Sequence, residues 1–353
     1  MVKWKKQEQL NMRKLLQNKK ISVVLLILLT VVVLFFSLKN NFFETLEQIK
    51  SMNFLWLFIA ILLLIGYWLF SSLAMKLITN KFNNKIKIEE IFKLNVVTQF
   101  FNGITPSSSG GQPYQIYALK KAGLTLVDST NVSIQTFVCY QFALVLLGFI
   151  SIIFNKVFAL FIKMDLLKVL IIVGFTVNIV IAVFLFAITI TKKMNKKIIK
   201  FIISFGYKLK IIKNKEEASK KLNDSIDQFQ QGTYLLLQDK KMLLLAIFYQ
   251  LLGLISLYSI PVALLFGMGD YGSINLGLSI VATAYVMVAG SFVPLPGGTG
   301  GLEYAFVSLF GNFIEGGKLT ALMIIWRFVT YYLGMIVGGI MLNIGKKEKT
   351  NGK

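Results

Sequence analysis

Two glycine-rich segments, one in each half of this 353-residue chain, repeat the same residue types at the same spacing. The first runs from Pro106 to Tyr114 and the second from Pro296 to Tyr304, and both follow the pattern P-x-x-x-G-G-x-x-Y. Proline and paired glycines interrupt a helix and leave backbone N–H and C=O groups without helical partners. A helix that restarts after such a break carries a partial positive charge at its N-terminus, where anions bind. We therefore expect free N–H groups at both restarts to face an anionic ligand.

Two ionisable side chains accompany the second segment. Glu303 follows the glycine pair, and Arg327 lies in the last apolar run of the chain. One interpretation is an ion pair that fixes the second segment to the last helix. The other is that Arg327 binds a phosphate through its planar guanidinium group, while Glu303 orients it or carries a coupling proton. The candidate substrate-binding residues are thus Ser107, Ser108, Ser109, Gly110, Gly111, Gln112, Gly297, Gly298, Thr299, Gly300, Gly301, Glu303 and Arg327.

Residues that commonly carry soluble-enzyme chemistry are scarce in this sequence. The chain contains no histidine, which is the usual general acid or base near neutral pH and the commonest metal ligand. Its single cysteine, Cys139, lies inside an apolar run, so no cysteine cluster can hold a metal. We expect no catalytic residue, no metal and no cofactor.

The elements that position the candidate residues are apolar and long. Apolar side chains make up 56% of the sequence, which is typical of a membrane protein. About 20 apolar residues form a helix that crosses the hydrocarbon core of a bilayer. An all-α integral membrane protein is predicted, with about six full transmembrane helices at Ile21–Leu38, Phe54–Thr79, Ser129–Phe154, Val169–Ile190, Met242–Phe266 and Leu319–Ile344.

The distribution of positive charge predicts the orientation in the membrane. With the N-terminus in the cytoplasm, 31 of the 38 Lys and Arg residues fall on the cytoplasmic side. The positive-inside rule therefore favours cytoplasmic N- and C-termini in a bacterial inner membrane. The basic parts are the N-terminal segment 1–20, the linker 191–241 and the tail 345–353. Anionic lipid explains the net charge of +22 without a nucleic-acid partner.

Two polar stretches, the linker 191–241 and an external stretch at residues 39–53, have helical character. In the linker, helices on the inner leaflet are expected, with a solvated linker as the alternative. On the external side, Phe42, Phe43, Leu46 and Ile49 follow helical spacing, which predicts an interfacial helix.

The two glycine-rich segments lie inside apolar regions 91–119 and 276–313, which we predict to be re-entrant helical hairpins. Each arm of the first is too short to cross the bilayer, because 13 or 14 helical residues span only about 20 Å. The predicted topology makes the two hairpins enter from opposite sides, one in the membrane half 21–190 and one in the half 242–344. Such inverted repeats are typical of transporters with a binding site at the bilayer midplane.

This interpretation has alternatives at the level of single residues. The alternative for both glycine-rich turns is that they only let helices pack closely, as small residues do in membranes. Gln99, Asn102, Gln135 and Gln141 either face a polar cavity or satisfy freed backbone groups. Aromatic residues such as Tyr331 are interfacial or packing residues by default.

Both motifs resemble a known family. The sequence looks like the lysylphosphatidylglycerol synthase transmembrane, or flippase-like, family in two places. The first is Pro106 to Pro113 with the nearby Gln115 to Gly123, and the second is Pro294 to Glu303. The resemblance covers Ile21 to Ile344. It implies that the membrane region translocates lipid. In two-part members of the family, a separate soluble C-terminal domain is the aminoacyltransferase. Since the sequence stops at Lys353, a stand-alone membrane domain is expected.

We therefore expect a flippase-like protein that moves an anionic or aminoacylated phospholipid through a polar cavity at the midplane. The alternatives are a membrane-embedded lipid-modifying transferase, for which the label phosphatidylglycerol lysyltransferase would apply, and a non-transporting accessory protein for a cell-envelope enzyme. The expected partners are phospholipid head groups and the membrane itself. A homo-oligomer and a partner lipid synthase are further possibilities.

Overall fold

The computed structural model describes residues 41–105, 108–158, 165–191, 215–290 and 295–350. Within them the regular structure is helical and no strand occurs, as the sequence predicts. The first half contains α2 (Phe42–Lys50), α3 (Phe54–Thr79), α4 (Ile88–Gly103), α5 (Gly111–Lys121), α6 (Leu126–Phe158) and α7 (Asp165–Ile190). The second contains α9 (Lys215–Gln238), α10 (Lys240–Tyr258), α11 (Ile260–Gly267), α12 (Leu276–Gly290), α13 (Gly301–Phe310), α14 (Gly316–Arg327), the π-helical η1 (Phe328–Leu333) and α15 (Gly334–Thr350).

Within the described ranges, four helical stretches are long and apolar enough to cross a bilayer, so the chain is a multi-pass membrane protein. They are Phe54–Thr79, Leu126–Lys156, Lys240–Gly267 and Gly316–Asn343. The predicted span Ile21–Leu38 lies outside the described residues. The predicted span Val169–Ile190 falls in α7, whose apolar stretch Ile171–Ala187 is shorter than these four. The count of six spans and their orientation remain predictions.

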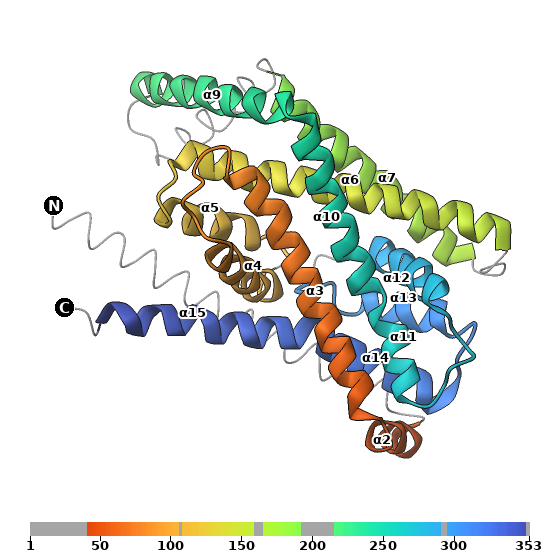
Figure 1. Cartoon of the computed structure of the whole chain (residues 1–353). Helices are drawn as coiled ribbons and strands as arrows, with labels where there is room; N and C mark the ends of the chain where they lie inside the picture. Colours follow the sequence, from red (N-terminus) through yellow and green to blue (C-terminus); the bar gives the residue numbers. More distant parts are fainter. Residues whose placement is uncertain (1–40, 106–107, 159–164, 192–214, 291–294, 351–353) are drawn as a thin grey trace.

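α3 and α10 lie side by side through the middle of the molecule (Figure 1). Asn53 begins α3, because its side chain accepts a hydrogen bond from the backbone N–H of Leu55 at 2.9 Å. Further along, Ser256 of α10 donates to the carbonyl of Leu63 at 2.7 Å. A Cβ atom on Gly66 would lie only 2.8 Å from the Ser256 hydroxyl, so glycine lets the two helices approach closely.

The two polar stretches with predicted helical character both contain helices. α2 covers the predicted external helix, and its Thr45 is buried where α2 packs on Gly317 of α14. α9 occupies the second part of the linker 191–241 and ends where α10 begins (Figure 1). Asn131 of α6 fixes α9, since it donates to the carbonyl of Phe229 at 3.0 Å and accepts from Thr233 at 2.9 Å.

Both predicted breaks separate two short helices that contact each other, α4 with α5 and α12 with α13. In each pair the second helix begins at the second glycine of the shared motif, Gly111 or Gly301, and the preceding glycine is its N-cap residue. The identical spacing thus places a helix start at the same motif position twice, although Gly110 has a right-handed helical backbone and Gly300 has a φ of +89°. Whether these helix pairs are re-entrant in the bilayer remains a prediction.

A core of apolar side chains holds α13 against α14. The rings of Phe306 and Phe310 stack with centroids 4.1 Å apart, and Phe306 also stacks on Trp326 at 4.6 Å. All three side chains are almost fully buried. This aromatic stack places the start of α13 beside the end of α14, where the charged candidates lie.

The ion pair between Asp270, in the loop after α11, and Lys318, at the start of α14, gives a prediction for the pH dependence of stability. Partial burial of Asp270 disfavours its charge, but hydrogen bonds from Ser273 and Lys318 outweigh this and lower its pKa to about 2. The Nζ of Lys318 lies 3.0 Å from Asp270 Oδ2. Because the folded pKa is below the unfolded value of 3.8, this stabilisation is complete above that value and is lost as pH falls towards 2.

We expect Asp270→Asn to remove this part of the acid sensitivity and to cost about 1 kcal/mol or less at neutral pH. Thermal unfolding of the detergent-solubilised protein between pH 7 and about pH 2 measures it. An unchanged difference between wild type and variant across that range would contradict the prediction.

Candidate functional site

The two charged candidates form a buried ion pair. Nε of Arg327 lies 2.6 Å from Oε1 of Glu303, and the two residues are 5% and 6% exposed. The second carboxylate oxygen accepts a hydrogen bond from the backbone N–H of Gly300 at 2.6 Å. Glu303 therefore connects the start of α13 to the end of α14, as the first sequence interpretation predicted.

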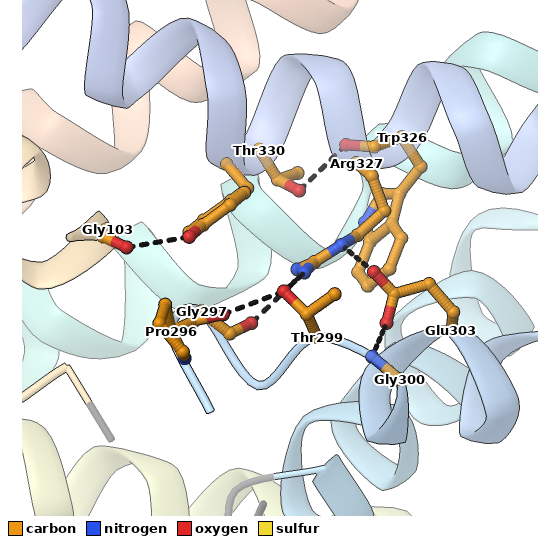
Figure 2. A network of polar contacts seen from close by, with 10 residues as sticks. Gly103, Pro296, Gly297, Thr299, Gly300, Glu303, Trp326, Arg327 and Thr330 are labelled. Atoms are coloured by element: carbon orange, nitrogen blue, oxygen red, sulfur yellow. Dashed lines mark hydrogen bonds and ion pairs between the residues drawn. The ribbon is translucent and has the colours of Figure 1, made fainter. Parts of the chain in front are cut away.

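The remainder of the guanidinium group binds the second glycine-rich turn. Arg327 Nη2 donates to the carbonyl of Gly297 at 3.1 Å and contacts the Thr299 hydroxyl at 3.4 Å. The Thr299 hydroxyl in turn donates to the carbonyl of Pro296 at 2.7 Å. Figure 2 shows the Arg327 side chain reaching between this turn and Glu303. Arg327 thus pairs with a backbone carbonyl that the helix break leaves without a helical partner.

One N–H group at each helix start is already paired. We expected free N–H groups at both restarts to face an anionic ligand. The N–H of Gly300, at the start of α13, donates to the Glu303 carboxylate, and the N–H of Gly110, at the start of α5, donates to the Thr105 hydroxyl at 2.8 Å. A carboxylate from the same helix provides the negative charge that the N-terminus of α13 favours, because the side chain three residues on can reach back to the N-cap residue.

Tyr331 joins the two breaks. Its hydroxyl donates to the carbonyl of Gly103, at the end of α4, at 2.7 Å. Its ring lies under the Arg327 guanidinium carbon, 4.7 Å from the ring centroid, and against Gly297. Tyr331 belongs to the π-helical turn η1, and such turns are frequent at functional sites. Residues from breaks almost 200 positions apart therefore meet around one side chain.

A cavity of about 650 Å³ lies between the two breaks and is within the range of ligand pockets. Of the predicted binding residues, Ser108, Ser109, Gln112, Gly297, Gly298 and Arg327 line it. The other described candidates do not line it and form the supporting group, which consists of Gly110, Gly111, Thr299, Gly300, Gly301 and Glu303. Ser107 lies outside the described residues. Six of the predicted residues thus border one cavity, and substrate binding by them remains a prediction.

The supporting glycines of the first break have a packing role. A Cβ atom on Gly111 would lie 2.1 Å from Oδ1 of Asn102, and one on Gly110 would lie 2.9 Å from the Phe101 carbonyl. The ring of Tyr114 stacks on Phe101 with centroids 4.5 Å apart. Close contact between α4 and α5 thus explains this glycine pair, which is the packing alternative considered for the sequence.

The cavity wall is rich in amides, about half of which the sequence did not identify. Gln99, Asn102 and Gln141, considered for such a role, line it, whereas Gln135 is buried outside the described lining. The unpredicted contributions come mainly from α6, α7, α10 and α12. Their lining side chains include Thr136, Tyr140, Asn178, Gln250, Tyr258 and Thr283. The available signal was an uncharged polar residue within an apolar run, which is costly unless it faces a polar space or a partner.

The turn that carries Gly297 gives a stability prediction. Gly297 has a φ of +61°, and a Cβ atom there would lie 2.2 Å from the Tyr331 ring. We expect Gly297→Ala to cost about 2–4 kcal/mol, from a left-handed backbone and a steric clash together. Gly269→Ala is the matched control, because Gly269 has a φ of +76° but no neighbour within 4 Å. Equal losses in a detergent unfolding assay would contradict the proposed contact with Tyr331.

The comparisons with known proteins agree with this architecture. Residues 21–338 match the family described as lysylphosphatidylglycerol synthase TM region. A curated relative, a UPF0104 membrane protein from Archaeoglobus fulgidus, is 26% identical over 311 residues, which are 85% of this chain and 89% of the relative. The family match includes both glycine-rich turns, the ion pair and the described helices around the cavity. This chain is a multi-pass membrane protein that belongs to the lysylphosphatidylglycerol synthase TM region family.

Proposed function

We propose that this protein translocates lipid, with the head group passing through the cavity between the two helix breaks. The observation that carries the proposal is a cavity of about 650 Å³ with a polar wall, built among helices apolar enough to cross a membrane. Hydrocarbon strongly disfavours polar side chains and irregular backbone, so both occur at membrane depth next to protein or a wet cavity. A lipid head group has the polarity and size that such a space accommodates.

The membrane placement is part of this proposal. The hairpins formed by α4 with α5 and by α12 with α13 enter from opposite sides, and both chain termini are cytoplasmic. The clustered Lys residues on the predicted cytoplasmic side then face anionic lipid. In this arrangement the two turns meet near the bilayer midplane, where inverted-repeat transporters bind their substrates. The head groups proposed from the sequence are anionic or aminoacylated phospholipid head groups.

The position of α7 supports an exchange between the cavity and the surrounding lipid. Asn178 on α7 lines the cavity and is 8% exposed, whereas Val180 and Val183 on the same helix are largely exposed. One helix therefore separates the polar space from an apolar surface of the kind that acyl chains cover. A lipid whose head group enters the cavity while its tails remain in the hydrocarbon avoids the cost of burying the head group in the bilayer core.

A reconstitution assay tests the proposal. Purified full-length protein is placed in liposomes that contain lipids with fluorescent acyl chains, and a membrane-impermeant reductant bleaches the outer leaflet. Translocation predicts bleaching beyond half of the fluorescence at a rate that rises with protein density. Bleaching no faster than in empty liposomes, for all the major bacterial phospholipids, would overturn the proposal. A new lipid species in these vesicles would instead point to head-group chemistry.

A further inference from the structure

The amide groups of the cavity show what a bound head group must offer. Oε1 of Gln250, a residue only 1% exposed, has no hydrogen-bond partner among the described residues. The same holds for Oδ1 of Asn102, whereas the Nε1–H of Trp326, another lining residue, lacks an acceptor. Buried polar atoms are nearly always paired, so the amide oxygens need a hydrogen-bond donor and the indole N–H needs an acceptor. A hydroxyl group both donates and accepts, whereas a phosphate group without hydroxyls offers acceptors only.

The charge of the cavity wall separates hydroxyl donors from ammonium donors. Among the described lining residues Arg327 is the charged one, and Glu303 at 2.6 Å compensates it. Most of the polar wall consists of eight neutral amides together with hydroxyl groups. An ammonium group there would lie near the guanidinium without a carboxylate of its own, and a buried charge without a partner is strongly disfavoured. A hydroxyl group avoids this penalty.

Aromatic rings complete the pattern. Tyr67, Tyr140 and Tyr258 line the cavity, and Phe137 stacks with Tyr140 at a centroid distance of 6.1 Å. A polyol has C–H groups that pack on ring faces and O–H groups at its edges that reach amides. The lining therefore offers apolar faces and neutral hydrogen-bonding groups together.

We propose that the cavity recognises the hydroxyl groups of a polyhydroxylated head group, such as the glycerol of phosphatidylglycerol or a sugar, and discriminates against head groups that carry an ammonium group. This inference rests on the proposed function in one respect, which is that the bound lipid is also the transported one. The binding preference itself can be measured without transport. It narrows the expected substrates away from aminoacylated lipid. Phosphatidylglycerol and a glycosyl diacylglycerol share the required chemistry and differ in the phosphate.

Native mass spectrometry of the full-length protein in detergent tests the preference. Two lipid pairs with identical acyl chains compete for the protein, phosphatidylglycerol against its lysyl ester and glucosyl diacylglycerol against glucosaminyl diacylglycerol. The second pair exchanges one hydroxyl for an ammonium group. We expect the polyol lipid of each pair to bind at least about tenfold more tightly. Binding of both polyol lipids identifies the hydroxyls as the recognised chemistry, whereas binding of phosphatidylglycerol alone adds the phosphate to the requirement.

A variant that introduces a negative charge into the cavity provides a second test, in addition to the competition with the wild-type protein. Gln250→Glu places a carboxylate in the cavity at nearly unchanged volume, and we expect it to shift both competitions towards the ammonium lipid. Gln238→Glu is the control, because Gln238 is exposed at the end of α9. Equal or tighter wild-type binding of the ammonium lipids would overturn the inference, as would an identical shift in both variants. Retained polyol preference without translocation in liposomes would overturn the proposed function and leave this inference standing.

Discussion

Replacing Glu303 with glutamine is expected to destabilise the protein by about 3–5 kcal/mol, because it leaves a buried guanidinium without its counter-charge. The pair is 2.6 Å apart, and both residues are about 95% buried. Glutamine keeps the shape of the side chain and still offers an oxygen to the N–H of Gly300. The loss therefore reports the missing charge rather than a missing cap. Reversible unfolding in mixed micelles, followed by tryptophan fluorescence, measures it.

A double-mutant cycle isolates the pair. Arg327→Gln alone should also be destabilising, whereas Arg327→Gln combined with Glu303→Gln should recover about 1–3 kcal/mol relative to the sum. The partly exposed pair of Asp270 and Lys318 provides the comparison, with an expected coupling of about 1 kcal/mol or less. If the buried pair couples no more strongly than the exposed pair, it does not hold α13 to α14 as described.

The second large effect concerns transport. Ser71 of α3 lines the cavity, and Ser71→Trp is expected to fill part of it and to slow lipid translocation at least about tenfold. The physical reason is that a head group without a polar path must cross hydrocarbon, where each unpaired polar group costs several kcal/mol. The liposome assay measures the rate.

Leu62→Trp on the same helix is the control for the bulk of the side chain. Leu62 is 47% exposed and does not line the cavity. Its variant should translocate lipid at the wild-type rate. Both proteins must elute as the same species in size-exclusion chromatography, so that misfolding is recognised. Full activity of Ser71→Trp would show that lipid moves by a path other than this cavity.

The sequence predicted the broken helices well, because the residues that break a helix act locally. Proline and paired glycines determine backbone geometry within a few residues, so the restarts at Gly111 and Gly301 follow from the shared motif. The pair of Glu303 and Arg327 was also accessible, as one of two interpretations, since few charged residues lie in the apolar runs. Such residues need a partner in a bilayer.

The wall of the cavity was less predictable for an equally physical reason. Asn178 and Gln250 lie in helices that are apolar all round, so no alternating pattern shows which side faces the cavity. Tyr331 was expected to be interfacial or packing by default, yet it contacts Gly103, Gly297 and Arg327. Its position depends on the π-helical turn η1, which depends on tertiary contacts.

The central claim is that the cavity between the two breaks holds a lipid head group. The most direct test is electron cryomicroscopy of the protein in nanodiscs that contain phosphatidylglycerol. The account predicts head-group density bordered by Ser108, Gln250 and Gly297, with acyl chains leading out towards the surrounding lipid. Well-resolved lipids around the outer surface, together with a cavity that contains only water or side chains, would contradict it.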